Sequence, residues 1–328
     1  MLRTLPPAPP RKGRGDSDLL RVRKERVSPP SLGRGRGWGA QHESMCTSPV
    51  LRKNRTLLTR AILYGIIIGF CVLFLVPIFG ACSIAFRLNK DIIREGFWVL
   101  PRPPTLKNFI YVFSEGKVQA FFTNTVIVTT FATGLSVLMG FLTGYAFGKL
   151  HFKREHLLYV IVIAGMFFPP QVVLIPLFKL FNAFHLLDSL AALVIVHVGF
   201  GIPICTLMMS NFFRDIPDEL RQSAMIDGCN EWRILFEIML PLSKPAITAL
   251  AILQFTWIWN DFLWPLVLIK TETRMTIQMG IMQLRGQYGL AWGNQAAACL
   301  IATIPTLLIF LFMQKYFIHG LTMGAVKE

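Results

Sequence analysis

Long stretches without charged side chains dominate this sequence of 328 residues. Five stretches contain no Asp, Glu, Lys or Arg and a sixth contains only Asp261; they cover residues 61–86, 118–148, 156–178, 189–213, 286–314 and 245–269. Each is longer than the roughly 20 apolar residues that a helix needs to cross the bilayer core. In lipid, each backbone N–H and C=O must find a partner within its own segment, so helices are predicted. We therefore predict an all-α integral membrane protein with six transmembrane helices.

The composition argues against the alternative, a set of buried helices in a large soluble core. Only 16% of the residues are charged, whereas soluble domains have about 25%. Soluble helices also alternate apolar and polar faces, which these stretches do not. The net charge of +15 has two sources, because +6 of it lies in residues 1–44 and the rest is scattered through loops. We therefore predict a lipid bilayer, and no nucleic acid, as the environment of this chain.

Residues 1–50 differ in composition from the rest of the chain. The first 44 residues hold ten Lys/Arg, six Pro and six Gly, and no run that could bury a core. We predict a disordered basic extension over 1–50 and a transmembrane domain over 51–328. An alternative is that translation starts at Met45 and that residues 1–44 belong to an over-extended reading frame.

Basic residues predict the orientation of the chain. With the N-terminus in the cytoplasm, the inner segments hold thirteen Lys/Arg and the outer loops hold ten. Cytoplasmic loops carry the excess of Lys/Arg in most membrane proteins. Because six spans return the chain to its starting side, both termini are predicted to be cytoplasmic.

The loop 214–244 is the long polar segment of the predicted inner side. Pro217 suits the first turn of a helix, and Asp218 and Glu219 follow at the positive end of the helix dipole. Gly228 supplies the backbone freedom for a turn, and a second helix is predicted to stop at Pro241. The first helix has an apolar stripe formed by Ile216, Leu220 and Ala224. A helix this short is only marginally stable in isolation, so we predict that it docks on a partner.

The spacing of Gln222-Ser223-Ala224, Gly228 and Leu240-Pro241 resembles the cytoplasmic "EAA" loop of permease subunits of binding-protein-dependent ABC importers. The resemblance is to the carbohydrate class, related to the smaller permease of the maltose transporter. Gln222 and Ser223 depart from the Glu and Ala of that loop, which leaves open whether ATPase coupling is altered. Three further stretches resemble the same family, and they are residues 168–177, 259–265 and 320–327.

The resemblance implies a type I ABC importer permease fold in a bacterial cytoplasmic (inner) membrane. It implies a second homologous permease, two subunits that bind ATP and Mg²⁺, and an extracytoplasmic solute-binding protein that delivers a mono- or oligosaccharide or related polyol. The residues implied to couple to the ATPases are Asp218, Glu219, Gln222, Ser223, Ala224, Asp227 and Gly228. A tail implied to contact them consists of Gly324, Ala325, Val326 and Lys327.

Polar residues inside apolar stretches are candidates for a substrate path. The four candidates are Gln171, His197, Gln254 and Asn260. For His197 the alternative is a hydrogen bond to a neighbouring helix. For Gln171, which follows two prolines, the alternative is a role of those prolines in packing. Trp259 and Trp264 are predicted to lie with Asp261 in the aromatic belt at the outer interface.

No motif in the sequence indicates catalysis, a metal site or a bound cofactor. The patterns GxxxxGK[ST], HExxH and GxSxG are absent, and the six histidines and six cysteines show no ligand spacing. An ion-coupled secondary transporter remains the alternative function, although it predicts buried acidic residues that are almost absent here. An intramembrane enzyme lacks a catalytic cluster, and a structural scaffold leaves the EAA-like spacing unexplained.

Overall fold

The computed structural model describes residues 49–286 and 289–323, which belong to two compact units, 1–63 and 64–328. In the first unit the described residues are helical and form the beginning of α1 (Pro49–Ala85). The predicted extension 1–50 lies outside the described residues except for its last two positions. All other elements belong to the second unit.

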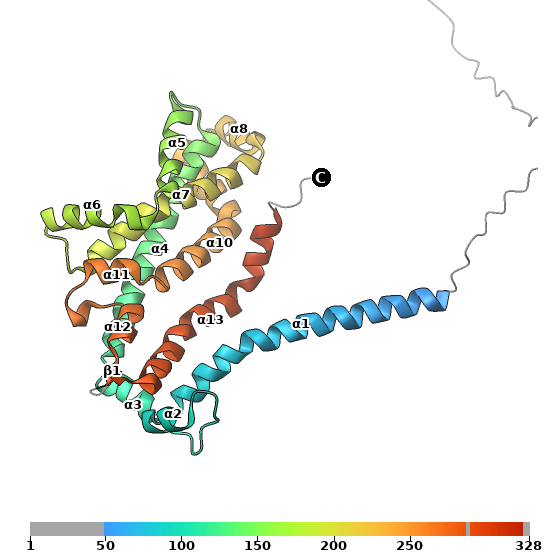
Figure 1. Ribbon diagram of the computed structural model, residues 1–328. Coiled ribbons are helices and arrows are strands. Elements are labelled where there is room, and N and C mark those ends of the chain that lie inside the picture. Colours follow the sequence, from blue (N-terminus) through green and yellow to red (C-terminus); the bar gives the residue numbers. More distant parts are fainter. Residues whose placement is uncertain (1–48, 287–288, 324–328) are drawn as a thin grey trace, which may run out of the picture. The chain divides into compact units, whose positions relative to one another are not determined.

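The described part of the second unit is almost entirely helical (Figure 1). After α1 its α-helices are α2 (Asn89–Glu95), α3 (Lys107–Ser114), α4 (Val118–Lys149), α5 (Glu155–Ala164), α6 (Pro170–Ala183), α7 (Leu190–Asp215), α8 (Asp218–Ile226), α9 (Glu231–Arg233), α10 (Leu240–Trp259), α11 (Leu263–Leu268), α12 (Ile277–Gln283) and α13 (Trp292–Met323). Shorter elements are the 3₁₀ turns η1 (Gly165–Phe167) and η3 (Glu272–Arg274), the π-helix η2 (Ile234–Met239), and the antiparallel strands β1 (Arg285–Gly286) and β2 (Gly289–Leu290).

Membrane-spanning helices account for most of the described chain. Five are long and apolar enough to cross a bilayer: Thr59–Ala85, Val118–Lys149, Leu190–Asp215, Glu231–Trp259 and Trp292–Met313. The predicted stretch 156–178 is instead broken into two helical segments that meet at an angle of 100°. The break falls at Phe168, which is extended because it precedes a proline. Five of the six predicted spans are therefore confirmed as continuous helices, whereas the predicted span 156–178 is a bent pair of helices.

The fifth span begins earlier than the sequence predicted. The second helix of the polar loop does not stop at Pro241 but continues without interruption from α9 through η2 into α10. In η2 the hydrogen bonds shift by one residue, so that Leu240 N–H reaches the carbonyl of Leu235. Pro241 then occupies the first turn of α10, and the Ser243 hydroxyl donates to the Met239 carbonyl at 2.8 Å. A π-turn therefore accommodates the missing proline N–H without ending the helix.

Small residues allow α4 to lie directly against α7. A Cβ on Gly140 or Gly144 would collide with Cys205 or Met209, and one on Gly148 would lie 2.8 Å from the Cβ of Phe213. Such a stripe of small residues permits close helix contact in lipid, where van der Waals packing drives association. The Thr143 and Thr206 hydroxyls, 2.6 Å apart, add a hydrogen bond between the two helices.

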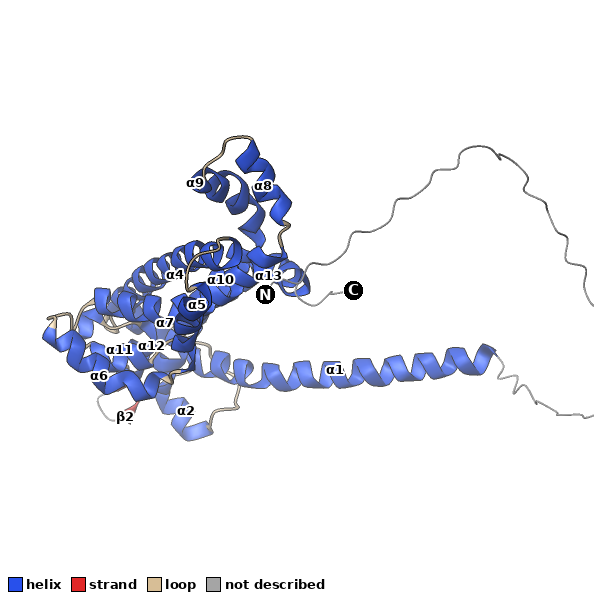
Figure 2. Cartoon of the chain, turned by 90° about the horizontal axis from the view of Figure 1, so that it is seen from above, coloured by secondary structure: helices blue, strands red, loops and turns tan. Residues whose placement is uncertain are grey.

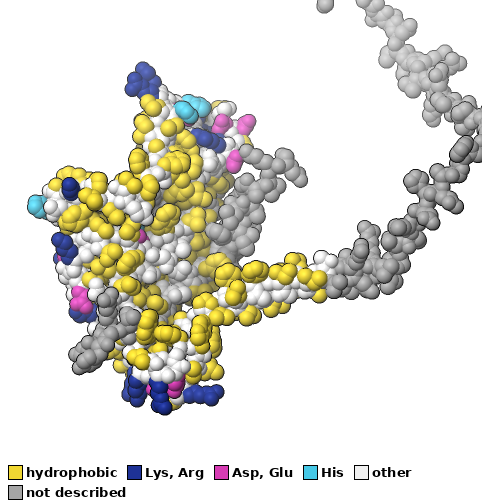
Figure 3. Space-filling view, in the orientation of Figure 1, with side chains coloured by type: hydrophobic (Ala, Val, Ile, Leu, Met, Phe, Trp, Pro, Cys, Tyr) yellow, Lys and Arg dark blue, Asp and Glu magenta, His cyan; other side chains and the backbone are white. Residues whose placement is uncertain are grey.

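The described chain has a largely apolar surface, as its low content of charged residues predicts. Hydrophobic side chains are spread over the whole face shown in Figure 3, and most of the charged side chains lie at its margins. Two hydrophobic clusters are buried beneath it. One of them, where α4 and α7 meet α8 and α10, includes Phe141, Phe213 and Met239 and supports the polar segment described below.

Asp188 holds two loops together at the end of the unit opposite α8. Its carboxylate accepts the Thr271 hydroxyl at 2.6 Å and the N–H groups of Thr271 and Lys270 at 2.8 and 2.9 Å. Arg274 lies 3.3 Å from the same carboxylate. These hydrogen bonds, chiefly that of the Thr271 hydroxyl, lower the pKa of Asp188 from 3.8 to about 2.

We expect Asp188→Asn to lower stability by about 1–2 kcal/mol at pH 7, since one pKa unit corresponds to about 1.4 kcal/mol. Because the folded pKa is depressed, this stabilisation is complete above about pH 4 and is lost as the pH falls toward 2. Asparagine tolerates the positive φ of 56° at this position. Thermal unfolding in detergent should thus show a gap between variant and wild type that closes between pH 4 and 2; a gap independent of pH would contradict the assignment.

Candidate functional site

A short helix projects beyond the ends of α4, α7 and α10 (Figure 2). This helix, α8, is preceded by Pro217 and has Asp218 and Glu219 in its first turn, as predicted. It ends at Ile226, and Gly228 in the turn that follows has a φ of +83°, the left-handed conformation that favours glycine. Gly228 N–H donates to the Met225 carbonyl and the next N–H donates to the Ala224 carbonyl, which is the hydrogen-bond pattern of a Schellman motif. The predicted start and turn of this helix are confirmed.

A lysine from α4 holds the first turn of α8. The Lys149 ammonium lies 2.5 Å from the Asp218 carboxylate and also donates to the Ile216 carbonyl. Only 2% of the Lys149 side chain is exposed. Its hydrogen bond and its charge lower the pKa of Asp218, so this carboxylate is ionised at neutral pH. A buried lysine without this partner would be costly, which makes the contact obligatory in the folded state.

A second polar network holds the other end of α8. Arg221 forms an ion pair with Glu231, the first residue of α9, and Tyr145 from α4 donates a hydrogen bond of 2.6 Å to the same carboxylate. The Glu231 hydrogen bond raises the pKa of Arg221. Together with the Lys149–Asp218 pair, these contacts form what we term the α8 clamp, which joins α8 and α9 to α4.

Sequence reasoning did not identify the clamp residues on α4. Tyr145 and Lys149 are four residues apart and therefore lie on one face of the helix, near its C-terminal end. This spacing was the feature of the sequence that indicated a shared role for the two side chains. It did not indicate which residues they contact, because Glu231 lies 86 residues after Tyr145 in the sequence.

Six of the seven predicted coupling residues are exposed and one is buried. Ala224 packs into the hydrophobic cluster beneath α8, so it anchors the helix rather than facing outward. Leu220, predicted to share its stripe, is exposed. The exposed members are Asp218, Glu219, Gln222, Ser223, Asp227 and Gly228.

Large hydrophobic side chains are exposed around this polar surface. Ile226 is 86% exposed at the end of α8, and Leu220 and Met225 are about half exposed. On the following helix, Trp232 and Phe236 are exposed and stack on each other with ring centroids 6.2 Å apart. An apolar patch rimmed by charged groups is typical of a surface that binds another protein. We refer to α8 with these five residues as the coupling surface.

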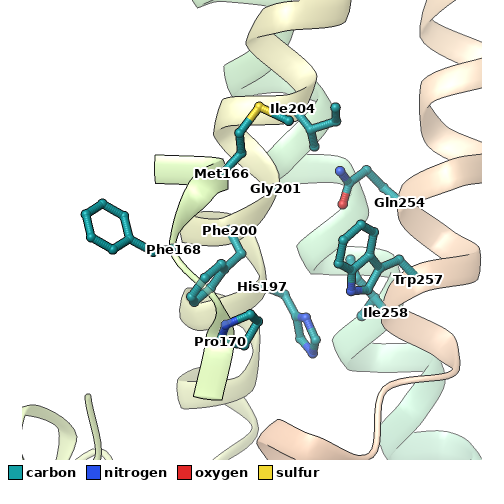
Figure 4. A pocket seen from close by; sticks show the side chains of 10 residues that line it. All are labelled: Met166, Phe168, Pro170, His197, Phe200, Gly201, Ile204, Gln254, Trp257 and Ile258. Carbon is teal, nitrogen blue, oxygen red and sulfur yellow. The ribbon is translucent and has the colours of Figure 1, made fainter. Parts of the chain in front are cut away.

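A pocket of about 140 Å³ opens between α7 and α10 (Figure 4). It is lined by Met166, Phe168, Pro170, His197, Phe200, Gly201, Ile204, Gln254, Trp257 and Ile258. Two predicted path residues, His197 and Gln254, are therefore brought together. The other two are not among its lining residues: Gln171 and Asn260 are exposed, and Asn260 donates to the carbonyl of Thr256 at 2.8 Å.

An acidic residue lies directly behind His197. The Asp261 carboxylate is 3.6 Å from His197 Nε2, and its oxygens accept the N–H groups of Leu263 and Trp264. The prediction that Trp259 and Trp264 lie in an interfacial belt is wrong, because both are buried within the chain. The Trp259 indole donates to the carbonyl of Ala302 at 2.9 Å, so it joins α10 to α13 instead.

Within residues 49–286 and 289–323, no group of three or more His, Cys, Asp or Glu side chains could hold a metal ion. The predicted tail, residues 324–327, lies outside the described residues.

The fold and this surface define a multi-span membrane protein with a small protruding helix that exposes apolar side chains. The chain matches the family described as "Binding-protein-dependent transport system inner membrane component" over residues 136–322 and belongs to it. This family comprises membrane subunits of ABC transporters that are not themselves enzymes.

A curated relative and two solved structures extend the comparison. The chain is 33% identical to the arabinooligosaccharides transport system permease protein AraQ of Halalkalibacterium halodurans, over 79% of this chain and 95% of the relative. It resembles in fold a crystal structure of a bacterial ABC transporter involved in the import of the acidic polysaccharide alginate, with a TM-score of 0.70, 23% identity, and coverage of 81% and 98%. A structure of a bacterial alginate ABC transporter in complex with an alginate pentasaccharide-bound periplasmic protein matches with a TM-score of 0.60, 19% identity, and coverage of 79% and 93%.

Proposed function

We propose that this chain is one of two permease subunits of an ATP-driven, binding-protein-dependent importer that carries a sugar across the bacterial cytoplasmic membrane. Its substrate is a mono- or oligosaccharide or a related polyol, delivered by an extracytoplasmic solute-binding protein. Family membership supports the transport role. The name of its arabinooligosaccharide relative supports the substrate class.

The observation that carries this proposal is the coupling surface held by the α8 clamp. In the proposed mechanism α8 sits in a cleft of one of two cytoplasmic ATPase subunits, which bind ATP and Mg²⁺. Closure of the ATPases displaces α8, and the Lys149 and Glu231 contacts transmit the displacement to α4. The two permeases then alternate between inward- and outward-facing states. In this proposal both termini lie in the cytoplasm, and residues 324–327 contact the ATPases.

The proposal is tested by introducing one charged side chain into the coupling surface. In the complete importer in vesicles we expect Ile226→Asp to weaken ATPase binding and reduce ATP-driven sugar uptake by about tenfold or more, because a carboxylate in an apolar cleft is costly. Ile93→Asp on α2 is the matched control, since Ile93 is also strongly exposed, at 73%, but lies outside the coupling surface.

Two results would contradict the proposal. One is normal ATPase binding and uptake by the Ile226 variant. The other is sugar uptake driven by an ion gradient in the absence of ATP, which would favour the alternative of a secondary transporter.

A further inference from the structure

We propose that the pocket between α7 and α10 binds one uncharged sugar unit of the transported substrate and that Asp261 excludes acidic sugars from it. This inference rests on the proposed function and narrows its substrate class. Trp257 would stack on the sugar ring, and His197 and Gln254 would form hydrogen bonds with its hydroxyl groups.

The lining has the composition of a site for a small polar ligand with apolar faces. Eight of its ten residues are apolar or glycine, and the two polar side chains, His197 and Gln254, are each more than nine-tenths buried. Binding pockets commonly combine an apolar, aromatic wall with a few polar groups that fix the orientation of the ligand. Figure 4 shows His197 from α7 facing Gln254 and Trp257 from α10 across the gap between the helices.

Trp257 offers a flat aromatic surface at the mouth of the pocket. It is 68% exposed, although it is followed on α10 by the buried residues Ile258 and Trp259. Its ring can therefore be covered by a ligand without displacing other side chains of the described chain. A sugar ring presents C–H groups on its faces and hydroxyl groups at its edge, so stacking on Trp257 directs the hydroxyls toward the two buried polar side chains.

The position of Asp261 determines which nitrogen of His197 can accept a hydrogen bond from a ligand. The carboxylate is held by the N–H groups of Leu263 and Trp264, and it faces His197 Nε2 at 3.6 Å. In a neutral imidazole, the negative charge favours the tautomer with its proton on Nε2. Nδ1 is then a hydrogen-bond acceptor, which suits a hydroxyl donor. The Gln254 amide supplies both a donor and an acceptor.

The charge around the pocket discriminates between sugars. None of the ten lining residues is Lys or Arg, and Asp261 is the acidic group beside His197. A uronic acid carboxylate bound next to His197 would be repelled by the Asp261 carboxylate behind it in a medium of low dielectric constant, and the pocket lining contains no Lys or Arg to compensate. The alginate transporter shares the fold at 23% identity, and a shared fold does not determine which sugar is bound.

The experiment uses the complete importer in nanodiscs and measures equilibrium binding of trisaccharides. The probes are three neutral trimers, arabinotriose, xylotriose and maltotriose, and two acidic trimers, of galacturonate and mannuronate. We expect at least one neutral trimer to bind and neither acidic trimer to do so. We expect about tenfold or more weaker binding of the neutral trimer in each of three variants, Gln254→Met, His197→Phe and Trp257→Leu. Each substitution removes a hydrogen-bonding or stacking group.

Thr256→Val is the matched control on α10, because the Thr256 hydroxyl donates to the Ile252 carbonyl of its own helix and does not line the pocket. It should bind the neutral trimer as the wild type does. Asp261→Asn should allow an acidic trimer to bind, because it removes the like charge. ATP-driven uptake by the same variants reconstituted in vesicles separates this inference from the proposed function.

Three results would overturn the inference while ATP-driven uptake persists. They are unchanged binding in the three pocket variants, binding of an acidic trimer by the wild type as tight as that of the neutral ones, and binding of no neutral trimer. Absence of ATP-driven uptake by the wild type with every trimer and its binding protein would instead overturn the proposed function.

Discussion

An importer that carries Gly228→Pro is expected to assemble and hydrolyse ATP but to take up sugar at least about tenfold more slowly than the wild type. Proline fixes φ near −65° and has no N–H. Gly228 has a φ of +83° and donates its N–H to the Met225 carbonyl. The substitution therefore breaks the turn between α8 and α9 and destabilises the local structure by about 3 kcal/mol or more. Displacement of α8 would no longer be transmitted through Glu231 to α4.

Gly96→Pro provides a closely matched control for this result. Gly96 has a φ of +85° and donates its N–H to the Ile92 carbonyl at 2.9 Å, and a Cβ at either glycine would meet no atom within 4 Å. The two variants therefore share the same backbone conflict, but Gly96 ends α2, which is not part of the coupling surface. ATP hydrolysis and uptake should remain coupled in Gly96→Pro. Normal uptake by Gly228→Pro, or equal uncoupling by both variants, would show that α8 is not the coupling helix.

Gly144→Leu is expected to have the largest effect on stability, about 3 kcal/mol or more, with little folded protein recovered from membranes. A Cβ at this position would lie 3.0 Å from the Met209 carbonyl carbon and from Ser210 N, and nearer still to the Met209 side chain. Backbone atoms cannot move aside as a flexible side chain can, so α4 and α7 would have to separate. The α8 clamp begins on α4 directly after this contact, at Tyr145, and should be displaced with it.

Gly134→Leu on the same helix tests whether crowding is the cause. A Cβ there would meet no atom within 4 Å, and removal of a helical glycine is favourable by up to about 1 kcal/mol. We expect this variant to match or exceed the wild type in yield of monodisperse complex and in thermal midpoint. Equal losses in both variants would mean that leucine is unfavourable anywhere on this helix and that the α4–α7 contact is not special.

Gly144 and Gly134 also show which part of the packing could not be predicted from the sequence. The second apolar stretch contains Gly134, Gly140, Gly144 and Gly148, a stripe of small residues that is typical of close helix packing. The last three pack against α7. Gly134 belongs to the same apparent stripe and faces open space. The direction in which a helix residue points depends on the rotation of the helix against its neighbour, which composition does not encode.

The membrane spans, the start of α8 and its glycine turn depend on local properties of the chain. Burial in lipid requires long apolar helices, and proline, acidic residues and glycine at fixed positions begin and end a short helix. Those features were accordingly predictable from neighbouring residues alone. Only the tertiary structure decides which distant side chains meet, because such contacts depend on how separate helices pack. It brings Glu231 to Tyr145 and His197 to Gln254, buries Trp259 against α13, and leaves Gln171 outside the pocket. The six apolar stretches alone therefore indicate a membrane protein, whereas packing between helices creates both the clamp on α8 and the pocket between α7 and α10.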